Sequence, residues 1–381
     1  MAQNMDKVRV NLKKTVDHSY DIHIGPDLFG KLAEDLKAHP VGDRYVLIAD
    51  ATVLKLHGNR LTETMRAAKL KVERIAFPAG EGSKSRKMKV YLEEHLFGLG
   101  LGRDCCFIAC GGGVTGDLVG YTAATFMRGV PWIQVPTTML AMVDASIGGK
   151  TGIDLPEGKN LIGAFHQPAA VWIDVSTLET LPRRHLVAGM AEVVKHAVIR
   201  DRAFFKLLED KAEAVLDGDP IAQRDVICRS CAIKAEVVSE DEKESELRRI
   251  LNYGHTLGHA FEAVSGFSLL HGEAVSLGMA SEGALAVSEG ILPKEELDRQ
   301  NALLKKLGLP VKASIVLRAL LGRAIRPKEI LDYTHTDKKA RQGITEYVMP
   351  AKIGQIKTNK KKMSIALEDR TILDFLRRTS L

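Results

Sequence analysis

The sequence contains few aromatic residues, and its apolar runs are short. Aromatic residues make up 5% of the 381 residues, and the basic residues form no stripe beyond the short run at 360–362. Nucleic-acid-binding proteins more often combine a basic stripe with interleaved aromatic side chains. No uninterrupted apolar run reaches the ~18 residues that a membrane-spanning helix requires. The composition therefore argues against both a nucleic-acid-binding protein and a membrane protein.

Cysteine is also scarce, and its placement indicates neither a disulfide framework nor a zinc framework. Cys105, Cys106 and Cys110 fall in one apolar run, and Cys228 and Cys231 form a single CxxC with no second pair downstream. A structural zinc site needs about four ligands, so we expect free cysteines in a reducing compartment. The first 14 residues lack the apolar segment of a signal peptide, which favours a cytoplasmic location.

The composition is that of an ordinary globular protein, with 45% hydrophobic and 27% charged residues. Two domains are expected for 381 residues, because domains usually run to about 100–200 residues. The net charge of +6 is spread along the chain and suits an anionic small-molecule substrate.

The first half of the chain alternates strand and helix patterns. We expect strands at residues 7–12, 20–24, 45–49, 72–77, 105–110, 132–135 and 171–174, and helices at 28–38, 53–68, 86–99 and 117–126. Strands that alternate with helices indicate a mostly parallel sheet covered on both faces, so we predict an α/β, Rossmann-like domain.

The second half changes character after Leu181-Pro182, where the apolar periodicity becomes almost wholly helical. Helices are expected at residues 186–199, 203–216, 221–238 and 273–289, with one late strand at 345–349. We therefore predict an α/β domain at residues 1–181 and a mainly α-helical domain at residues 182–381.

A glycine loop at residues 110–117 (CGGGVTGD) follows a buried strand and opens a helix. Glycine lets the backbone approach a ligand closely, and a helix N-terminus offers free N–H groups to a phosphate. The loop lacks the GxGxxG fingerprint, so a tight strand–helix turn without a ligand is the alternative. Other strand ends carry further candidate nucleotide ligands, namely Asp50, Glu81, Lys84, Thr137 and Thr138.

A second glycine-rich stretch, at residues 144–160, contains GGKT but is not a P-loop. The first glycine of a GxxxxGK[ST] motif would fall at Asp144. Asp144, Lys150 and Asn160 are instead candidates for contacts with a hydroxyl and a phosphate of a substrate. The alternative for this stretch is an ordinary surface loop.

A candidate metal centre combines one carboxylate with histidines on other predicted helices. His255 and His259 lie four residues apart on one helix, and His271 opens the next. Together with Glu192 they offer the carboxylate and two imidazoles of a catalytic zinc site, where the metal polarises substrate oxygens. His196, four residues after Glu192, competes as a ligand, so spacing alone leaves the ligand set open.

Taken jointly and in this order, the motifs of the chain resemble those of the 3-dehydroquinate synthase family over nearly the whole length. They are GGGVTGD at 111–117, PTT at 136–138, DASIGGKT at 144–151, GKN at 158–160, AEVVK at 191–195, NYGHTLGH at 252–259 and HGE at 271–273. The resemblance implies an N-terminal NAD-binding domain, a C-terminal helical domain that binds metal and substrate, an active site in the cleft between them, and a homodimer.

The resemblance also implies a reaction of the shikimate pathway, which converts 3-deoxy-D-arabino-heptulosonate 7-phosphate to 3-dehydroquinate and phosphate. NAD⁺ would oxidise the C5 hydroxyl, phosphate would leave by β-elimination, NADH would return the hydride, and an intramolecular aldol step would close the ring. NAD is thus recycled. Zinc or cobalt would bind the C4 and C5 hydroxyls and polarise the C5 oxygen.

Site roles follow from the resemblance. The expected metal ligands are Glu192, His255 and His271, which leaves His196 out. Arg248 would bind the substrate carboxylate, and Arg128 would reach the phosphate from the partner subunit. The other substrate residues are expected to be Asp144, Lys195 and Lys234 at the sugar hydroxyls, and Lys150, Asn160, Asn252, His259 and Lys338 at the phosphate. Lys338 is not distinguished from its neighbour Lys339. Arg248 and Asn252 lie four residues apart, so on an α-helix they would share a face.

The NAD site implied by the resemblance draws on the strand ends and the glycine loop. Its expected residues are Asp50, Glu81, Lys84, Gly113, Asp117, Thr137, Thr138, Lys150, Lys159 and Thr180. After Asp50 the family often carries a Thr-Asn pair, whereas this chain has Ala51-Thr52. That departure puts one adenosine-side contact in doubt and leaves the chemistry untouched.

Three other functions compete with this one. Other sugar phosphate cyclases, such as 2-epi-5-epi-valiolone or 2-deoxy-scyllo-inosose synthases, tend to differ at the positions of Asn252 and Lys338, which here match the dehydroquinate pattern. A metal-dependent alcohol or glycerol dehydrogenase would not need residues 144–160. A nucleotide-binding regulator without catalysis would have no use for a metal beside Lys195 and Arg248.

Overall fold

The computed structural model describes residues 17–156, 158–336, 344–360 and 362–379 of the chain. Its N-terminal half is built on a six-stranded sheet in the order β1-β8-β5-β4-β2-β3, in which every pair of neighbours is parallel. The strands are β1 (Asp21–Gly25), β2 (Arg44–Asp50), β3 (Val72–Phe77), β4 (Cys105–Gly111), β5 (Trp132–Pro136) and β8 (Ala170–Asp174). The predicted α/β class is confirmed, and the strand expected at residues 7–12 lies outside the described residues.

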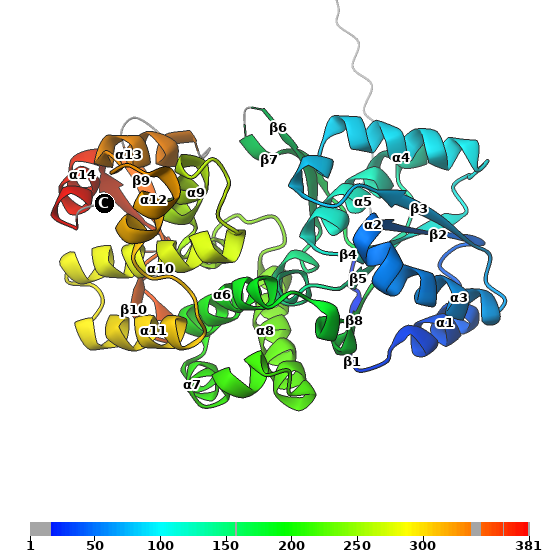
Figure 1. Ribbon diagram of the computed structural model, residues 1–381, viewed down its shortest axis with the longest axis horizontal. Helices are drawn as coiled ribbons and strands as arrows, with labels where there is room; N and C mark the ends of the chain where they lie inside the picture. Colours follow the sequence, from blue (N-terminus) through cyan, green and yellow to red (C-terminus); the bar gives the residue numbers. More distant parts are fainter. Residues whose placement is uncertain (1–16, 157, 337–343, 361, 380–381) are drawn as a thin grey trace, which may run out of the picture.

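Helices cover both faces of this sheet (Figure 1). They are α1 (Phe29–Ala38), the continuous helical segment α2 (Ala51–Val53), η1 (Leu54–Gly58) and α3 (Asn59–Ala67), α4 (Arg86–Gly98) and α5 (Gly113–Thr125). In β4, Cys106, Ile108 and Cys110 belong to the core under α1 and α3, whereas Phe107 and Ala109 belong to the core under α4 and α5. Burial on both faces explains why β4 reads as an unbroken apolar run.

Helix α5 begins at Gly113, four residues before the expected start at residue 117. Gly113 and Gly116 belong to this helix, which lies close against the sheet. A Cβ atom on Gly116 would lie 2.7 Å from Gln134 Oε1, and one on Gly120 would lie 2.6 Å from the Trp132 ring. A glycine run that permits helix–sheet contact is hard to distinguish from a loop in the sequence.

The glycine-rich stretch at residues 144–160 forms an ordered hairpin instead of a surface loop. A one-turn π-helix, η4 (Ala141–Ala145), leads to β6 (Lys150–Leu155), which pairs antiparallel with β7 (Gly158–Phe165). Gly152 and Gly163 face each other across the pair, and a Cβ on Gly163 would lie 1.9 Å from Thr151 O. The glycines that hid these strands in the sequence are what allow the two backbones to approach.

The second half is mainly helical, as expected. Its helices are α6 (Arg183–Arg200), α7 (Arg202–Leu216), α8 (Pro220–Glu240), α9 (His255–Val264), α10 (His271–Ser288), α11 (Lys294–Lys306), α12 (Ala313–Leu321), α13 (Pro327–Thr336) and α14 (Asp369–Arg378). No helix in the described part of the chain is long and apolar enough to cross a membrane.

Two small antiparallel pairs replace the single late strand expected at residues 345–349. β9 (Ile344–Tyr347) pairs with β12 (Ile365–Glu368), and β10 (Pro350–Lys352) pairs with β11 (Gln355–Ile356). In Figure 1, α6 and α8 lie between the sheet and the group of helices α9–α14. One continuous core joins Val171 and Ile173 of β8 to side chains of α6, α7 and α8.

Candidate active site

Three side chains from three helices form a compact group that can hold a metal ion. Glu192 lies on α6, His255 is the first residue of α9 and His271 is the first residue of α10. The Nε2 atoms of His255 and His271 lie 3.5 and 3.4 Å from Glu192 Oε1. Glu192 is fully buried, and within the described residues its Oε1 has no hydrogen-bond partner, whereas its Oε2 pairs with Lys195. A buried carboxylate that faces two imidazoles has the donor set of a catalytic zinc site.

The second nitrogen of each imidazole is also engaged, which orients the ring. His255 Nδ1 lies 3.1 Å from Tyr253 O, and His271 Nδ1 lies 3.6 Å from Glu262 Oε2. Metal-binding histidines typically make this kind of outer contact with a carbonyl or carboxylate. Glu262 was not a candidate from the sequence. Its spacing of three residues from His259 on α9 is the signal that would have found it.

The surroundings of the two imidazoles shift their pKa values in opposite directions. Burial lowers the pKa of His255 well below its usual value, and Lys195 acts in the same sense, which favours the neutral form that binds metals. Burial would also lower the pKa of His271, but the Glu192 and Glu262 carboxylates raise it to about 10. A divalent cation held by the same carboxylate takes the place of that proton, so metal binding should release protons.

Other groupings of donor atoms within the described residues also lie within 4.8 Å of one another. They are His259–Glu262–His271 and Asp144–Glu192–His196. His196 is fully buried, and its Nδ1 lies 2.7 Å from Ser230 Oγ. Its other nitrogen lies 3.5 Å from Asp144 Oδ1. Geometry alone therefore does not select among the three groups.

Two buried lysines and one aspartate stand next to the Glu192 group. Lys234 Nζ donates to Asp144 Oδ1 at 2.7 Å and to the Asp144 carbonyl at 2.6 Å. Lys195 forms an ion pair with Glu192 one turn back on α6, and its Nζ lies 3.9 Å from Asp144 Oδ1. Burial would raise the pKa of Asp144, but Lys234 and Lys195 hold it well below its usual value. The structure thus brings together all three residues expected at the sugar hydroxyls.

Lys150 and Asn252 meet through a carboxylate that the sequence did not single out. Glu244 accepts a hydrogen bond from Asn252 Nδ2 at 2.8 Å through Oε1 and forms an ion pair with Lys150 through Oε2. Glu244 belongs to a charged run, residues 240–249, of the kind that is usually a solvated surface. Only the fold shows that this glutamate joins the hairpin residue Lys150 to Asn252.

The expectation that Arg248 and Asn252 share a helix face is wrong. Both lie in a 3₁₀-helix, η6 (Leu247–Asn252), where three residues complete a turn and positions four apart point about 120° apart. The Arg248 side chain is buried, and its guanidinium donates to the carbonyl of Gly148 at 3.1 Å and to that of Glu242. The guanidinium therefore lies against the start of the β6–β7 hairpin, and it has further N–H groups that these two hydrogen bonds do not use.

Residues expected at the nicotinamide cofactor gather where β6 and β7 meet α5. Lys84 is buried and lies 2.5 Å from Asp117 Oδ2, and it also hydrogen-bonds to Asn160. Burial would lower the pKa of Lys84, but Asp117 and other carboxylates nearby hold it above its usual value. Lys159 lies 3.7 Å from Glu81 Oε1 and 3.4 Å from the Glu262 carboxylate, so it connects this region to the metal group.

The glycine loop and the end of β5 form the other wall of this region. Gly112 is the N-cap of α5 and provides no side-chain cap, so Gly113 opens a helix whose first N–H groups have no partner inside the helix. Thr137 N–H donates to Gly111 O at 3.0 Å, and a Cβ on Gly112 would lie 3.2 Å from Thr138 Cγ2. Three of the expected cofactor residues are thus neighbours at the carboxyl ends of β4 and β5.

Among the described residues, Asp50, Arg128 and Thr180 make no hydrogen bond or ion pair with this group. Asp50 caps α2 by accepting from the N–H groups of Thr52 and Val53 at 2.9 and 3.0 Å. Thr180 Oγ1 lies 2.8 Å from His57 Nε2. Arg128 is exposed on a turn, and Lys338 lies outside the described residues.

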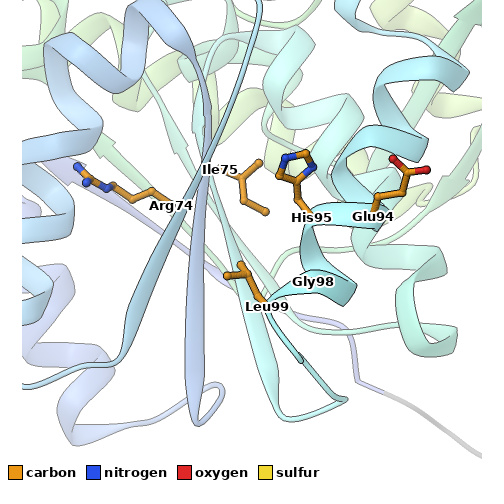
Figure 2. Close-up of a pocket in the computed structure, with 6 residues that line it drawn as sticks. All are labelled: Arg74, Ile75, Glu94, His95, Gly98 and Leu99. Carbon is orange, nitrogen blue, oxygen red and sulfur yellow. The ribbon is translucent and has the colours of Figure 1, made fainter.

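A hollow of about 370 Å³ lies elsewhere, between β3 and α4 (Figure 2). Its lining residues are Arg74, Ile75, Glu94, His95, Gly98 and Leu99. None of them is a candidate site residue, and the side chains offer no converging polar groups. The Glu192 group, in which a buried carboxylate faces two imidazoles, is the better candidate for chemistry.

Comparison with known proteins matches the two halves of the chain to two consecutive families. Residues 74–188 match the family described as 3-dehydroquinate synthase N-terminal, and residues 189–340 match 3-dehydroquinate synthase C-terminal. The 3-dehydroquinate synthase of Symbiobacterium thermophilum is 45% identical over 342 residues, which cover 89% of this chain and 93% of that protein.

Solved structures of two related enzymes share the fold. 2-Epi-5-epi-valiolone synthase from Streptomyces hygroscopicus, with NAD⁺ and Zn²⁺ bound, aligns with a TM-score of 0.84 and 29% identity, covering 98% of this chain and 99% of the other. 2-Deoxy-scyllo-inosose synthase, complexed with carbaglucose-6-phosphate, NAD⁺ and Co²⁺, aligns with a TM-score of 0.82 and 26% identity, covering 94% and 96%.

Proposed function

The chain belongs to the 3-dehydroquinate synthase family, and from that premise we propose how its residues serve the family reaction. It is a lyase of aromatic biosynthesis that converts 3-deoxy-D-arabino-heptulosonate 7-phosphate to 3-dehydroquinate and phosphate. It uses NAD⁺ and a divalent metal, zinc or cobalt. The observation that carries the site is the group Glu192, His255 and His271, which stands beside two buried lysines.

The residues present fit both cofactors. Two imidazole nitrogens lie within 3.5 Å of a buried carboxylate oxygen that has no hydrogen-bond partner among the described residues, so we propose Glu192, His255 and His271 as the metal ligands. The uncapped N-terminus of α5 suits a pyrophosphate, and the contacts Lys84–Asp117 and Lys159–Glu81 support a cofactor site nearby. The proposed NAD residues are Glu81, Lys84, Gly113, Asp117, Thr137, Thr138 and Lys159. Asp50, Lys150 and Thr180 are proposed as further NAD contacts.

When bound, the metal supplies a Lewis acid for the substrate oxygens and NAD⁺ supplies a reversible hydride acceptor. The protein's own groups position the substrate. Asp144 and Lys234 present a fixed carboxylate and ammonium to the sugar hydroxyls, and Lys195 completes this pair. Because these charges are buried and preorganised, they can stabilise developing charge without reorganisation.

The two ends of the substrate carry different anions, and the proposed contacts separate them. Arg248 offers a planar fork to the carboxylate. Lys150, Asn160, Asn252, His259 and Lys338 are the proposed phosphate residues. Glu244, which holds Lys150 and Asn252 together, must exchange partners when the phosphate enters, because an incoming anion competes with its carboxylate.

The function is tested by incubating the protein with the heptulosonate phosphate, NAD⁺ and Zn²⁺. Phosphate and 3-dehydroquinate should appear in equal amounts. The absence of dehydroquinate, or faster turnover of a sugar phosphate without a carboxylate, would favour another cyclase.

We further propose a homodimer in which Arg128 reaches the partner's phosphate site. Met127 and Arg128 both adopt left-handed backbone conformations, with φ of 51° and 68°, and Arg128 is exposed. Such a turn costs about 1–3 kcal/mol per residue, which suits a side chain that must project outward. The protein should have the mass of a dimer in solution. Arg128→Ala should lower activity about tenfold or more by loss of a charged hydrogen bond and leave the dimer intact. A fully active monomer would contradict the proposal.

The two-domain division at Leu181-Pro182 and the cytoplasmic location are also proposals. The last strand of the sheet ends at Asp174, and the first long helix of the second half begins at Arg183, which supports the boundary. Limited proteolysis should cut first near residues 175–183, and cuts confined to other segments would contradict the boundary. Recovery of the activity in a membrane or secreted fraction would contradict the proposed cytoplasmic location.

A further inference from the structure

Helix α9 begins without a cap of its own, although it carries a proposed metal ligand as its first residue. Its N-cap is Gly254, which has no side chain and a φ of 77°. The first N–H groups of any α-helix have no partner inside the helix. At α9, Gly254 and Leu257 are buried, so another part of the chain must satisfy their N–H groups.

Glu282 on the neighbouring helix α10 provides the missing cap. Its Oε2 accepts from Gly254 N–H at 2.7 Å, and its Oε1 accepts from Leu257 N–H at 2.9 Å. The Glu282 side chain is fully buried. A carboxylate at a helix N-terminus is favoured by both the hydrogen bonds and the helix dipole. A buried carboxylate is costly to maintain for packing alone.

Close contact between α9 and α10 lets the Glu282 carboxylate reach the N-terminus of α9. A Cβ on Gly254 would lie 2.9 Å from Val275 O, and a Cβ on Gly278 would lie 1.9 Å from Gly254 O. The backbones of α9 and α10 therefore touch at this point, and no larger residue fits at either glycine. Glu282, one turn beyond Gly278 on α10, lies directly opposite the start of α9.

The same segment of backbone fixes the His255 ring. His255 Nδ1 contacts the carbonyl of Tyr253, the residue just before Gly254, and its Nε2 points at Glu192. On the other side, α10 carries His271 as its first residue, eleven residues or about three turns before Glu282. One helix thus holds one imidazole directly and the other through Glu282.

We propose that Glu282 is a positioning residue that sets the geometry of the metal ligands. It anchors Gly254 and Leu257 and so fixes the position of His255 relative to His271 and Glu192. The inference rests on the proposed metal site. It adds a residue that touches neither metal nor substrate and acts only through the backbone of α9.

The test compares Glu282→Gln and Glu282→Asp with the unchanged protein, each first stripped of metal. Glutamine keeps the shape but sets an NH₂ group against a backbone N–H, and aspartate keeps the carboxyl group but shortens the side chain. Zn²⁺ affinity, measured by competition with a chelating dye, should fall about 10- to 100-fold in Glu282→Gln, as for other residues that support metal ligands. The Zn²⁺ affinity of Glu282→Asp should lie between that of Glu282→Gln and that of the unchanged protein.

A spectroscopic readout separates positioning from stability. The visible absorption of bound Co²⁺ reports the ligand geometry, and it should shift in Glu282→Gln. The matched control is Leu285→Ala, one turn further along α10, where the lost side chain is also fully buried but has no polar atom. It should lower the melting temperature through a cavity and leave the Zn²⁺ affinity and the Co²⁺ spectrum unchanged.

The outcomes distinguish this inference from the proposed function. If both Glu282 variants bind Zn²⁺ as tightly as the unchanged protein and give its Co²⁺ spectrum, Glu282 positions nothing and the inference is overturned. Equal losses of affinity in Leu285→Ala would also overturn it, since stability alone would then explain them. If the unchanged protein binds no Zn²⁺, the proposed metal centre itself is wrong.

Discussion

Replacing Glu192 with glutamine should abolish metal binding and lower kcat/KM by about a thousandfold or more. Glu192 is fully buried and pairs with Lys195 through Oε2, while its Oε1 has no hydrogen-bond partner within the described residues and faces both imidazoles, as a metal ligand would. Polarisation of substrate oxygens by a metal is worth several kcal/mol, and about 4 kcal/mol corresponds to a thousandfold in rate. Removing the metal with a chelator should have the same effect, and Zn²⁺ or Co²⁺ should restore activity to the unchanged protein but not to Glu192→Gln.

The control for this prediction is His196→Ala. His196 lies next to the group, but its Nδ1 is within hydrogen-bond distance of Ser230 Oγ, and it is outside the proposed ligand set. His196→Ala should keep stoichiometric metal, and His271→Ala should lose it. The reverse pattern, with metal lost from His196→Ala and kept by His271→Ala, would show that the Asp144–Glu192–His196 group is the real site.

Arg248→Lys should lower kcat/KM for the heptulosonate phosphate by about 10- to 100-fold. It should leave kcat/KM almost unchanged for a sugar phosphate that has no carboxylate. A charge-assisted hydrogen bond is worth about 1.5–3 kcal/mol, and lysine keeps the charge but loses the planar fork. The guanidinium already bonds to the carbonyls of Gly148 and Glu242, so it is held in place before substrate arrives. The measurement is kcat/KM for the natural substrate and for sedoheptulose 7-phosphate in both proteins.

Only the ratio between the two substrates decides this prediction. Loss of the two carbonyl contacts could lower activity toward both substrates equally, because the hairpin would shift. A ratio that stays constant would show that Arg248 does not recognise the carboxylate. The assignment of substrate ends to Arg248 and to the Lys150–Asn252 pair would then have to be exchanged or abandoned.

The elements that the sequence predicted well are those whose pattern reflects burial. β4 reads as an apolar run because helices cover both faces, and β3 has the predicted bounds, residues 72–77. The hairpin β6–β7 was not predicted, because its glycines and charged residues serve close backbone pairing and the site instead of a core. Tertiary contacts, which a sequence pattern does not contain, decide whether glycine marks a loop or a close approach.

The same limit applies to the candidate site. Histidine and lysine spacing, read with the family resemblance, pointed to Glu192, His255, His271, Lys195 and Lys234, and the fold brings these together. That evidence did not point to Glu262 or Glu282, because acidic residues in helices are usually exposed and only the fold shows that these two are buried. It did not point to Glu244 either, because this residue lies in an irregular, charged segment between α8 and η6. The helix face expected for Arg248 and Asn252 was wrong because η6 is a 3₁₀-helix, ending just before the left-handed Gly254.

The central claim is that NAD⁺ is reduced and reoxidised within a single turnover, and the most direct test counts product against cofactor. The protein is loaded with Zn²⁺ and given excess heptulosonate phosphate with a small, known amount of NAD⁺, while NADH absorbance is followed. Many molecules of 3-dehydroquinate should form per NAD⁺, with no net growth of NADH absorbance. NADH that accumulates in proportion to product would contradict it and would make the protein a dehydrogenase on this fold.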